Sequence, residues 1–229
     1  MFAETAEYIK TGNFPGASWR DSTPYTSRSV QTIEHGASLF FQGDDAEYVF
    51  EVVEGVVASY SVLADGRRQV HCFFFPGDML GLTPDAVYHA NTCSIGKSRV
   101  CSIPRAKLMQ IAKERPEIAA KLFESAAAQL VGMQDHFVLL GRKCAQEKVA
   151  SFLSALGARY ASEGADTVTF RLPMTRSEIG DYLGLTIETV SRTMTKLRIA
   201  GAINLPNPAT VEILSRRRLE RLAGDGAGY

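Results

Sequence analysis

Residues 173–192 carry the start and stop signals of two short helices, and this pattern constrains the fold more than any other stretch of the chain. Thr175 and Glu178 have the spacing of a capping box, in which each side chain bonds the other residue's backbone N–H. Gly184 suits the left-handed conformation that ends a helix, and Thr186 suits the cap of a second one. Two short helices joined by a glycine turn predict a helix-turn-helix. The residues expected to face inward are Ile179, Leu183, Val190, Met194 and Leu197.

Two short strands are expected after the second helix, Ala202–Leu205 and Thr210–Leu214, joined by the turn Pro206-Asn207-Pro208. A hairpin in this place fits the wing of a winged helix-turn-helix. The chain has no net charge, but its two parts differ in charge. Residues 1–140 contain 12 Lys/Arg and 16 Asp/Glu, whereas residues 141–229 contain 13 Lys/Arg and 9 Asp/Glu. The basic C-terminal part indicates contact with a polyanion.

The outward face at the start of the second helix carries side chains that can read base edges. An Arg can bind guanine O6 and N7 with two hydrogen bonds, and a Glu can accept one from cytosine N4. The predicted base-reading residues are Ile187, Glu188, Ser191 and Arg192. The predicted phosphate contacts, which set register rather than sequence, are Arg176, Ser177, Thr186 and Thr189. A plain surface ion pair between Glu188 and Arg192, four residues apart, is the alternative.

Short apolar runs broken by glycine-bearing turns fill residues 38–103, and turns every 8–12 residues predict a small antiparallel barrel. Asp65-Gly66 supplies the positive φ of a tight hairpin. The expected strands are Leu39–Phe41, Tyr48–Val53, Val56–Leu63, Val70–Phe75, Tyr88–Ile95 and Ser98–Ile103.

The pattern becomes helical after Pro104. Arg105–Arg115 forms one predicted helix, and a second begins near Pro116, carrying apolar residues at a 3-4-3-4-3 spacing over about five turns. These seam residues, the predicted dimer interface, are Phe123, Ala126, Leu130, Met133, Phe137 and Leu140. A single helix packed on its own barrel is the alternative. After the seam helix, Ala145–Tyr160 is a predicted amphipathic helix and Val168–Leu172 a predicted short strand.

The predicted fold is α+β: an antiparallel β-roll or jelly roll, a long dimerisation helix and a C-terminal winged helix-turn-helix. The expected boundaries are an irregular arm at 1–30, the β-roll at 31–115, the dimerisation helix at 116–141 and the DNA-binding domain at 142–229. No apolar run is long enough for a membrane span, and the four cysteines form no C-x-x-C pair. We therefore expect a cytoplasmic protein that binds no membrane.

Residues 175–192 resemble the DNA-binding signature of the cyclic-AMP receptor protein/FNR superfamily of bacterial transcription regulators. The run from Glu178 to Arg192, EIGDYLGLTIETVSR, is most similar to the FNR and FixK branch. Ile187 stands where the cyclic-AMP-binding branch carries an arginine. The resemblance implies a homodimer, a TTGAT-N4-ATCAA-like palindrome in double-stranded DNA, and transcription activation through contact with RNA polymerase.

The family's sensory groups lack their ligands in this sequence. Leu82 stands where the cyclic-nucleotide branch has a glutamate, and no arginine lies near Asn91 to hold a phosphate. Residues 1–71 contain no cysteine, so the four-thiolate iron–sulfur site of the FNR type is not expected, and Cys101 is interpreted as a buried strand residue.

The FixK resemblance thus implies a regulator of low-oxygen and respiratory genes without a cofactor of its own. A barrel gated by haem or another ligand is the alternative within this class, and redox control through Cys144, which lies among basic residues, is another. An enzyme on a cupin-like barrel would need clustered metal ligands, which the spacing of His71 and His89 does not provide. An interaction module that does not bind DNA is the remaining rival.

Overall fold

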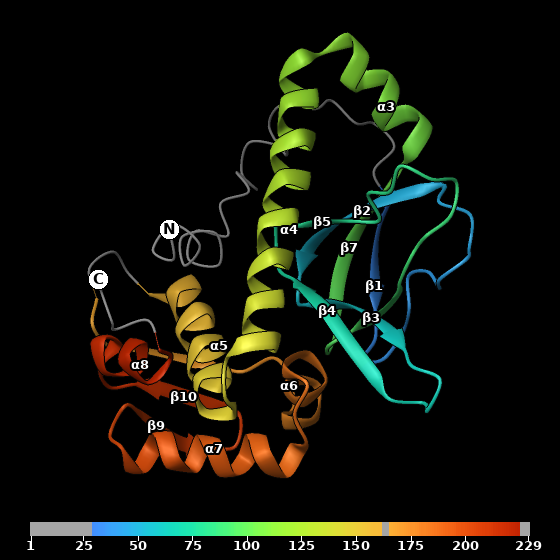
Figure 1. The fold of residues 1–229 in the computed structure, drawn as a ribbon. Helices are drawn as coiled ribbons and strands as arrows, with labels where there is room; N and C mark the ends of the chain where they lie inside the picture. Colours follow the sequence, from blue (N-terminus) through green and yellow to red (C-terminus); the bar gives the residue numbers. More distant parts are fainter. Residues whose placement is uncertain (1–28, 162–164, 225–229) are drawn as a thin grey trace. The chain divides into compact units, whose positions relative to one another are not determined.

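The computed structural model describes residues 29–161 and 165–224. These residues divide into two compact units, and the boundary lies between residues 130 and 131. Figure 1 shows the elements of both units. The predicted arm at 1–30 lies, up to residue 28, outside the described residues. Each unit is described by itself.

The first unit is an antiparallel β-roll of two sheets. One sheet has the order β1-β7-β2-β5 and the other the order β4-β3-β6. Its strands are β1 (Ser29–Ile33), β2 (Tyr48–Glu54), β3 (Val57–Val62), β4 (Arg68–Phe74), β5 (Met79–Leu80), β6 (Asn91–Ser94) and β7 (Ser98–Pro104). The tight turn between β3 and β4 has Gly66 at φ +83°, as predicted.

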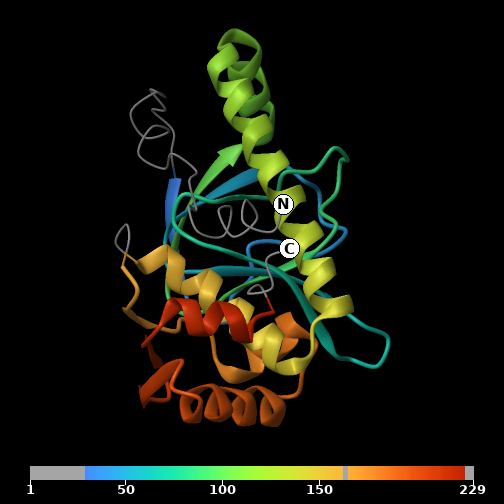
Figure 2. The same cartoon turned by 60° about the vertical axis from the view of Figure 1, so that its left-hand side comes forward.

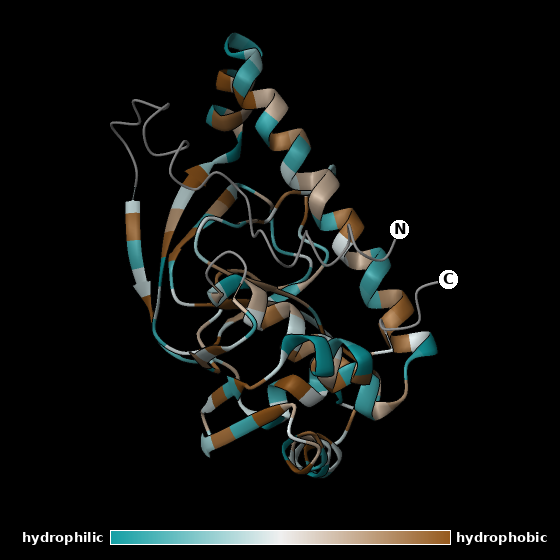
Figure 3. Ribbon diagram, turned by 90° about the vertical axis from the view of Figure 1, so that its left-hand side faces the viewer, coloured by the Kyte–Doolittle hydropathy of each residue, from teal (hydrophilic) through white to brown (hydrophobic). Residues whose placement is uncertain are grey.

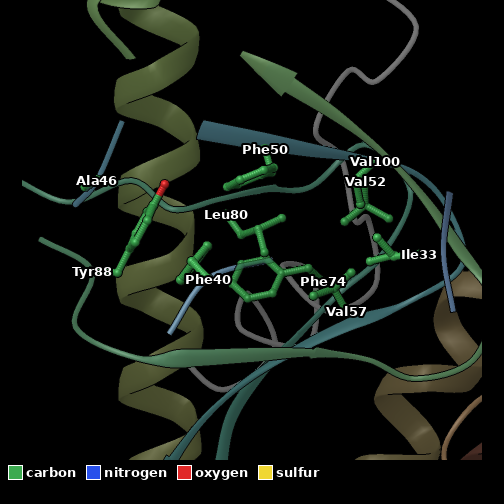
Figure 4. Packing of buried hydrophobic residues seen from close by; sticks show 10 residues of the cluster. All are labelled: Ile33, Phe40, Ala46, Phe50, Val52, Val57, Phe74, Leu80, Tyr88 and Val100. Carbon is green, nitrogen blue, oxygen red and sulfur yellow. The ribbon is translucent and has the colours of Figure 1, made fainter. Parts of the chain in front are cut away.

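A cluster of aromatic and aliphatic side chains packs between the two sheets (Figure 4). Phe40 and Tyr88 stack with ring centroids 3.7 Å apart, and Phe50 lies 5.7 Å from Phe40. The Tyr88 hydroxyl donates to the carbonyl of Tyr48 at 2.7 Å and accepts from the Tyr48 backbone N–H at 3.2 Å. This buried tyrosine therefore has its hydroxyl satisfied, as a polar group in an apolar core requires.

A second apolar cluster covers the outer face of the four-stranded sheet. Val49 and Met79 pack there against Leu108 of α3 (Arg105–Glu114) and Ile118 of α4 (Pro116–Arg142). Cys101 is buried in this cluster, as the sequence predicted.

The strand predicted at Leu39–Phe41 is wrong. The backbone N–H groups of Leu39 and Phe40 donate to the Thr92 side-chain hydroxyl, at 3.0 and 3.2 Å, and that of Phe41 donates to Asp44 Oδ2. Side chains therefore satisfy the donors that a strand would offer to its neighbour. The sequence also did not predict β1 and β5.

The second unit contains the end of α4, then α5 (Ala145–Tyr160), α6 (Arg176–Leu183), α7 (Ile187–Ile199) and α8 (Arg216–Leu222). Its sheet has the order β8-β10-β9, from β8 (Val168–Arg171), β9 (Ile203–Asn207) and β10 (Thr210–Ile213). Figures 1 and 2 both show α7 at the surface of this unit, leading into β9. The predicted wing hairpin is present, and β8 adds a third strand to it by pairing with β10.

Candidate nucleic-acid interface

The first helix of the predicted helix-turn-helix is α6, and the local sequence fixes both of its ends. Thr175 Oγ1 accepts from the Glu178 backbone N–H at 3.2 Å, while the Thr175 N–H donates to Glu178 Oε2 at 2.7 Å. Gly184 ends the helix at φ +62°, in the left-handed region where glycine has no steric penalty. The predicted capping box and glycine turn are both confirmed.

The second helix, α7, begins where Thr186 Oγ1 accepts from the Thr189 backbone N–H at 3.2 Å. Val190, Met194 and Leu197 are almost completely buried, which confirms the predicted inward face. Burial of these side chains on a 3.6-residue period leaves the opposite face of the helix to solvent.

The four predicted base-reading residues lie together on that exposed face. Ile187, Glu188, Ser191 and Arg192 are all exposed, on the first two turns of α7. A helix that enters the major groove of DNA contacts bases with side chains in this position. The structure therefore brings an apolar group, a carboxylate, a hydroxyl and a guanidinium onto one surface.

Glu188 is held in its ionised form. Its own backbone N–H and the Thr186 hydroxyl keep the pKa of the Glu188 carboxyl below its usual value, and the charge of Arg192 adds to this effect. An ionised carboxylate is an acceptor only, which is the property that contact with a cytosine amino group needs.

The predicted phosphate contacts divide into two kinds. Ser177 and Thr186 are exposed and Thr189 is half-buried, all close to the start of a helix. Arg176 is half-buried instead, and its Nη2 donates to the carbonyl of Pro208 in the wing turn at 3.0 Å. Burial lowers the pKa of Arg176, although an arginine stays charged at neutral pH. Arg176 thus joins the first helix to the wing.

Two residues with no predicted role support the interface. Gly180 lies in α6, and a Cβ there would come within 2.6 Å of the Leu185 carbonyl oxygen. Arg218 of α8 donates through Nη1 to the carbonyl of Ala200, at the C-terminal end of α7, at 3.1 Å. A glycine inside a helix was the available signal for the first residue. The second contact joins distant segments, and no local pattern marks it.

The predicted dimer seam on α4 is largely uncovered in the single chain. Phe123 and Phe137 are 74% and 77% exposed, and Ala126, Leu130 and Met133 are exposed as well. Leu140 is half-buried and lies near Gly184. Figure 3 shows apolar residues recurring along α4 between polar ones. Large aromatic side chains in solvent mark a surface that normally contacts a partner.

A β-roll, a long helix with an apolar seam and a winged helix-turn-helix in one chain define a DNA-binding regulator. Residues 30–115 match the model of the cyclic nucleotide-binding domain, and residues 147–222 match that of the Crp-like helix-turn-helix domain. The chain belongs to the CRP/FNR family of transcription regulators. Within the described residues, no helix is long and apolar enough to cross a membrane.

Within this family, the chain is similar to several FixK-type regulators and activators. The chain is 41% identical to the nitrogen fixation regulation protein FixK of Bradyrhizobium diazoefficiens, over 79% of each chain. It is 39% identical to the transcriptional activatory protein AadR of Rhodopseudomonas palustris, over 86% of this chain and 82% of the relative. The solved structure of FixK2 from Bradyrhizobium japonicum superposes with a TM-score of 0.81 at 36% identity, covering 89% of this chain and all of that one. These similarities identify a FixK-like transcription regulator that binds DNA and is not an enzyme.

Proposed function

We propose that the protein is a homodimeric transcription activator that reads a TTGAT-N4-ATCAA-like palindrome and controls low-oxygen and respiratory genes. The observation that carries this proposal is the exposed set Glu188, Ser191 and Arg192 on the first turns of α7. Its carboxylate and guanidinium match the hydrogen-bonding edges of cytosine and guanine. The predicted partners are double-stranded DNA, a second copy of the chain and RNA polymerase, and the metabolic role rests on similarity to FixK.

The test of base reading is a titration at fixed salt of TTGAT-N4-ATCAA and of a copy with both half-site guanines changed. Wild-type protein should bind the first probe more tightly by about 1–3 kcal/mol per guanine. Arg192→Ala should remove most of this difference, whereas Arg198→Ala, an exposed arginine at the other end of α7, should keep it. Equal binding of both probes by the wild type would refute the proposed operator.

The proposed dimer depends on the exposed seam of α4. Two copies that bury Phe123, Leu130 and Phe137 against each other would remove a large apolar area from water. Phe137→Glu should therefore give a monomer in light scattering after size exclusion. Val62→Glu, at an exposed apolar site on β3 outside the seam, is the control and should leave the mass unchanged. A Phe137→Glu variant with the wild-type mass would rule out this interface.

The proposed independence from a cofactor is supported by what occupies the β-roll. Phe40, Phe50 and Tyr88 pack between its sheets as part of a cluster of buried hydrophobic side chains. Leu82 packs against the second apolar cluster instead of facing a ribose. Arg105 donates to the carbonyl groups of Thr83, Pro84 and Asp85 and so ties the segment after β5 to the start of α3.

Independence from a cofactor is tested by operator binding of protein purified in air with no ligand added, together with the absorption spectrum of that protein. Tight binding and a visible spectrum without absorption bands would support the proposal, since haem and iron–sulfur centres absorb visible light. A visible absorption band, or binding that appears only after a ligand is added, would replace it with a ligand-gated regulator.

A further inference from the structure

The last turns of α4 present two different faces within adjacent residues. Phe137, on the seam, is 77% exposed, while His136 beside it is only 9% exposed. Successive residues of an α-helix point about 100° apart, so the two side chains leave the helix in different directions. One helical turn therefore carries both a seam residue and a contact inside the second unit.

The buried contact is a group of three aromatic rings, which we name the aromatic joint: His136, Tyr182 and Phe152. The His136 ring meets the Tyr182 ring of α6 nearly edge-on, with centroids 4.0 Å apart and planes at 84°. Tyr182 also lies 5.7 Å from the Phe152 ring of α5. Edge-to-face contacts have a preferred geometry, so they restrain the angle between helices as well as their distance.

Further contacts secure α4 around the joint. Leu140 lies one turn beyond His136, and its Cδ2 is 3.6 Å from the place where a Cβ on Gly184 would stand. Lys143, just after α4, donates from Nζ to Ser151 Oγ and to the carbonyl of Ala223, both at 2.8 Å. The end of α4 is thus bound to α5, to the turn after α6 and to the residue that follows α8.

The joint lies close in sequence to α7, the second helix of the helix-turn-helix and therefore its recognition helix. Tyr182 is two residues before Gly184, which ends α6, and Thr186 then starts α7. A change in the angle between α4 and α6 therefore moves the start of α7. We propose that the aromatic joint is a positioning element, which fixes the separation of the two recognition helices in the dimer and thereby selects the spacer between half-sites.

This inference rests on the proposed function, because it concerns two recognition helices on one palindrome. Each base pair added to a spacer moves one half-site by about 3.4 Å and rotates it by about 34–36° around the DNA axis. A stiff joint cannot follow that displacement, whereas a loosened joint can follow it at the cost of weaker binding to the best spacer. Spacer preference is therefore a readout of the joint that a loss of overall stability would not mimic.

The experiment measures affinity of the full-length protein for palindromes with spacers of three, four and five base pairs. Wild-type protein should prefer one spacer by about tenfold or more, and His136→Ala and Tyr182→Leu should reduce that ratio at least about threefold. His136→Phe keeps a ring in place and should keep most of the preference. Tyr160→Leu removes a different aromatic contact of the same unit, the stack with Phe170 at 5.2 Å, and should leave the ratio unchanged.

An unchanged ratio in both His136→Ala and Tyr182→Leu would overturn the joint as a positioning element, whatever their absolute affinity. Failure of the wild type to bind any of the palindromes would instead refute the proposed operator. Hydrogen exchange, which needs no DNA, then decides on the joint. His136→Ala should speed exchange of the α6 amides and spare those of β9 and β10, and equal protection of α6 in both proteins would refute the joint.

Discussion

Gly180 allows a sharp test of how tightly the helix-turn-helix is packed. A Cβ at this position would lie 2.6 Å from the backbone carbonyl oxygen of Leu185, inside the 3.0 Å below which real Cβ contacts are essentially never found. The obstacle is backbone, which cannot rotate away as a side chain can. Gly180→Ala must therefore displace the turn by at least about 0.4 Å, and the displacement passes to Thr186, the cap of α7.

The expected cost is the difference of two opposing effects. Alanine in a helix interior is favoured over glycine by about 0.5–1 kcal/mol. Forcing an extra methyl group into a closely packed site costs about 1–3 kcal/mol. We expect a net loss of about 1–2 kcal/mol, equivalent to a fall in Tm of about 5–10 °C for a unit of this size.

Thermal unfolding followed by circular dichroism measures this loss, and the chain contains a matched control. Gly141, near the end of α4, has nothing within 4 Å of its would-be Cβ. The same substitution there should leave Tm unchanged or slightly higher. Gly180→Ala should also weaken operator binding well below its Tm, since the start of α7 moves.

Equal stability of the Gly180→Ala and Gly141→Ala variants would refute this reasoning. It would mean that the turn between α6 and α7 yields without cost, so the close approach at Leu185 would not constrain the recognition helix.

Three further predictions concern single side chains. Arg176→Met should weaken operator binding with an unchanged salt dependence, because Arg176 supports the wing turn through Pro208. A salt slope smaller by about 1.8, which is about 0.9 for each protomer of the dimer, would show that Arg176 neutralises a phosphate instead. Burial raises the pKa of the Asp135 carboxyl, and the positive charge of Lys143 offsets part of this rise. The protonated carboxyl therefore favours the folded state, and this contribution to stability is lost as the pH rises and the carboxyl ionises. Asp135→Asn should accordingly raise Tm at pH 7, and the gain should vanish at acid pH; a constant gain would contradict this cause. Thr175→Ala should lower the free energy of unfolding by about 1 kcal/mol, measured with denaturant, because the α6 cap is lost. Thr175→Ser keeps a capping hydroxyl and should keep most of the wild-type stability.

The features that the sequence predicted well are those with local physical signals. The capping box at Thr175, the glycine turn at Gly184 and the inward face of α7 each depend on residues a few positions apart. The exposed positions of the base-reading candidates follow directly from that inward face. Once the ends and the buried face of a helix are known, the helical period fixes which of the remaining residues lie on the exposed face.

The features that the sequence missed depend on contacts between distant segments. Strand β1 is exposed over most of its length and, among the described strands, pairs only with β7, so it has no alternating apolar pattern. The apolar run Leu39–Phe41 resembles a strand, but Thr92, more than fifty residues away, accepts from the backbone N–H groups of Leu39 and Phe40. The supporting contacts of Arg176 and Arg218 likewise join segments 32 and 18 residues apart.

The uncovered apolar face of α4, as the proposed dimer interface, would connect operator occupancy to the amount of protein in the cell. A palindrome that needs two chains is filled in proportion to the square of the protomer concentration when most chains are single. Twice as much protein then gives about four times the occupancy, until pairing saturates. In such a regulator, synthesis and degradation of the chain set the response, and a substitution at Phe137 that weakens pairing moves the threshold without touching a single DNA contact.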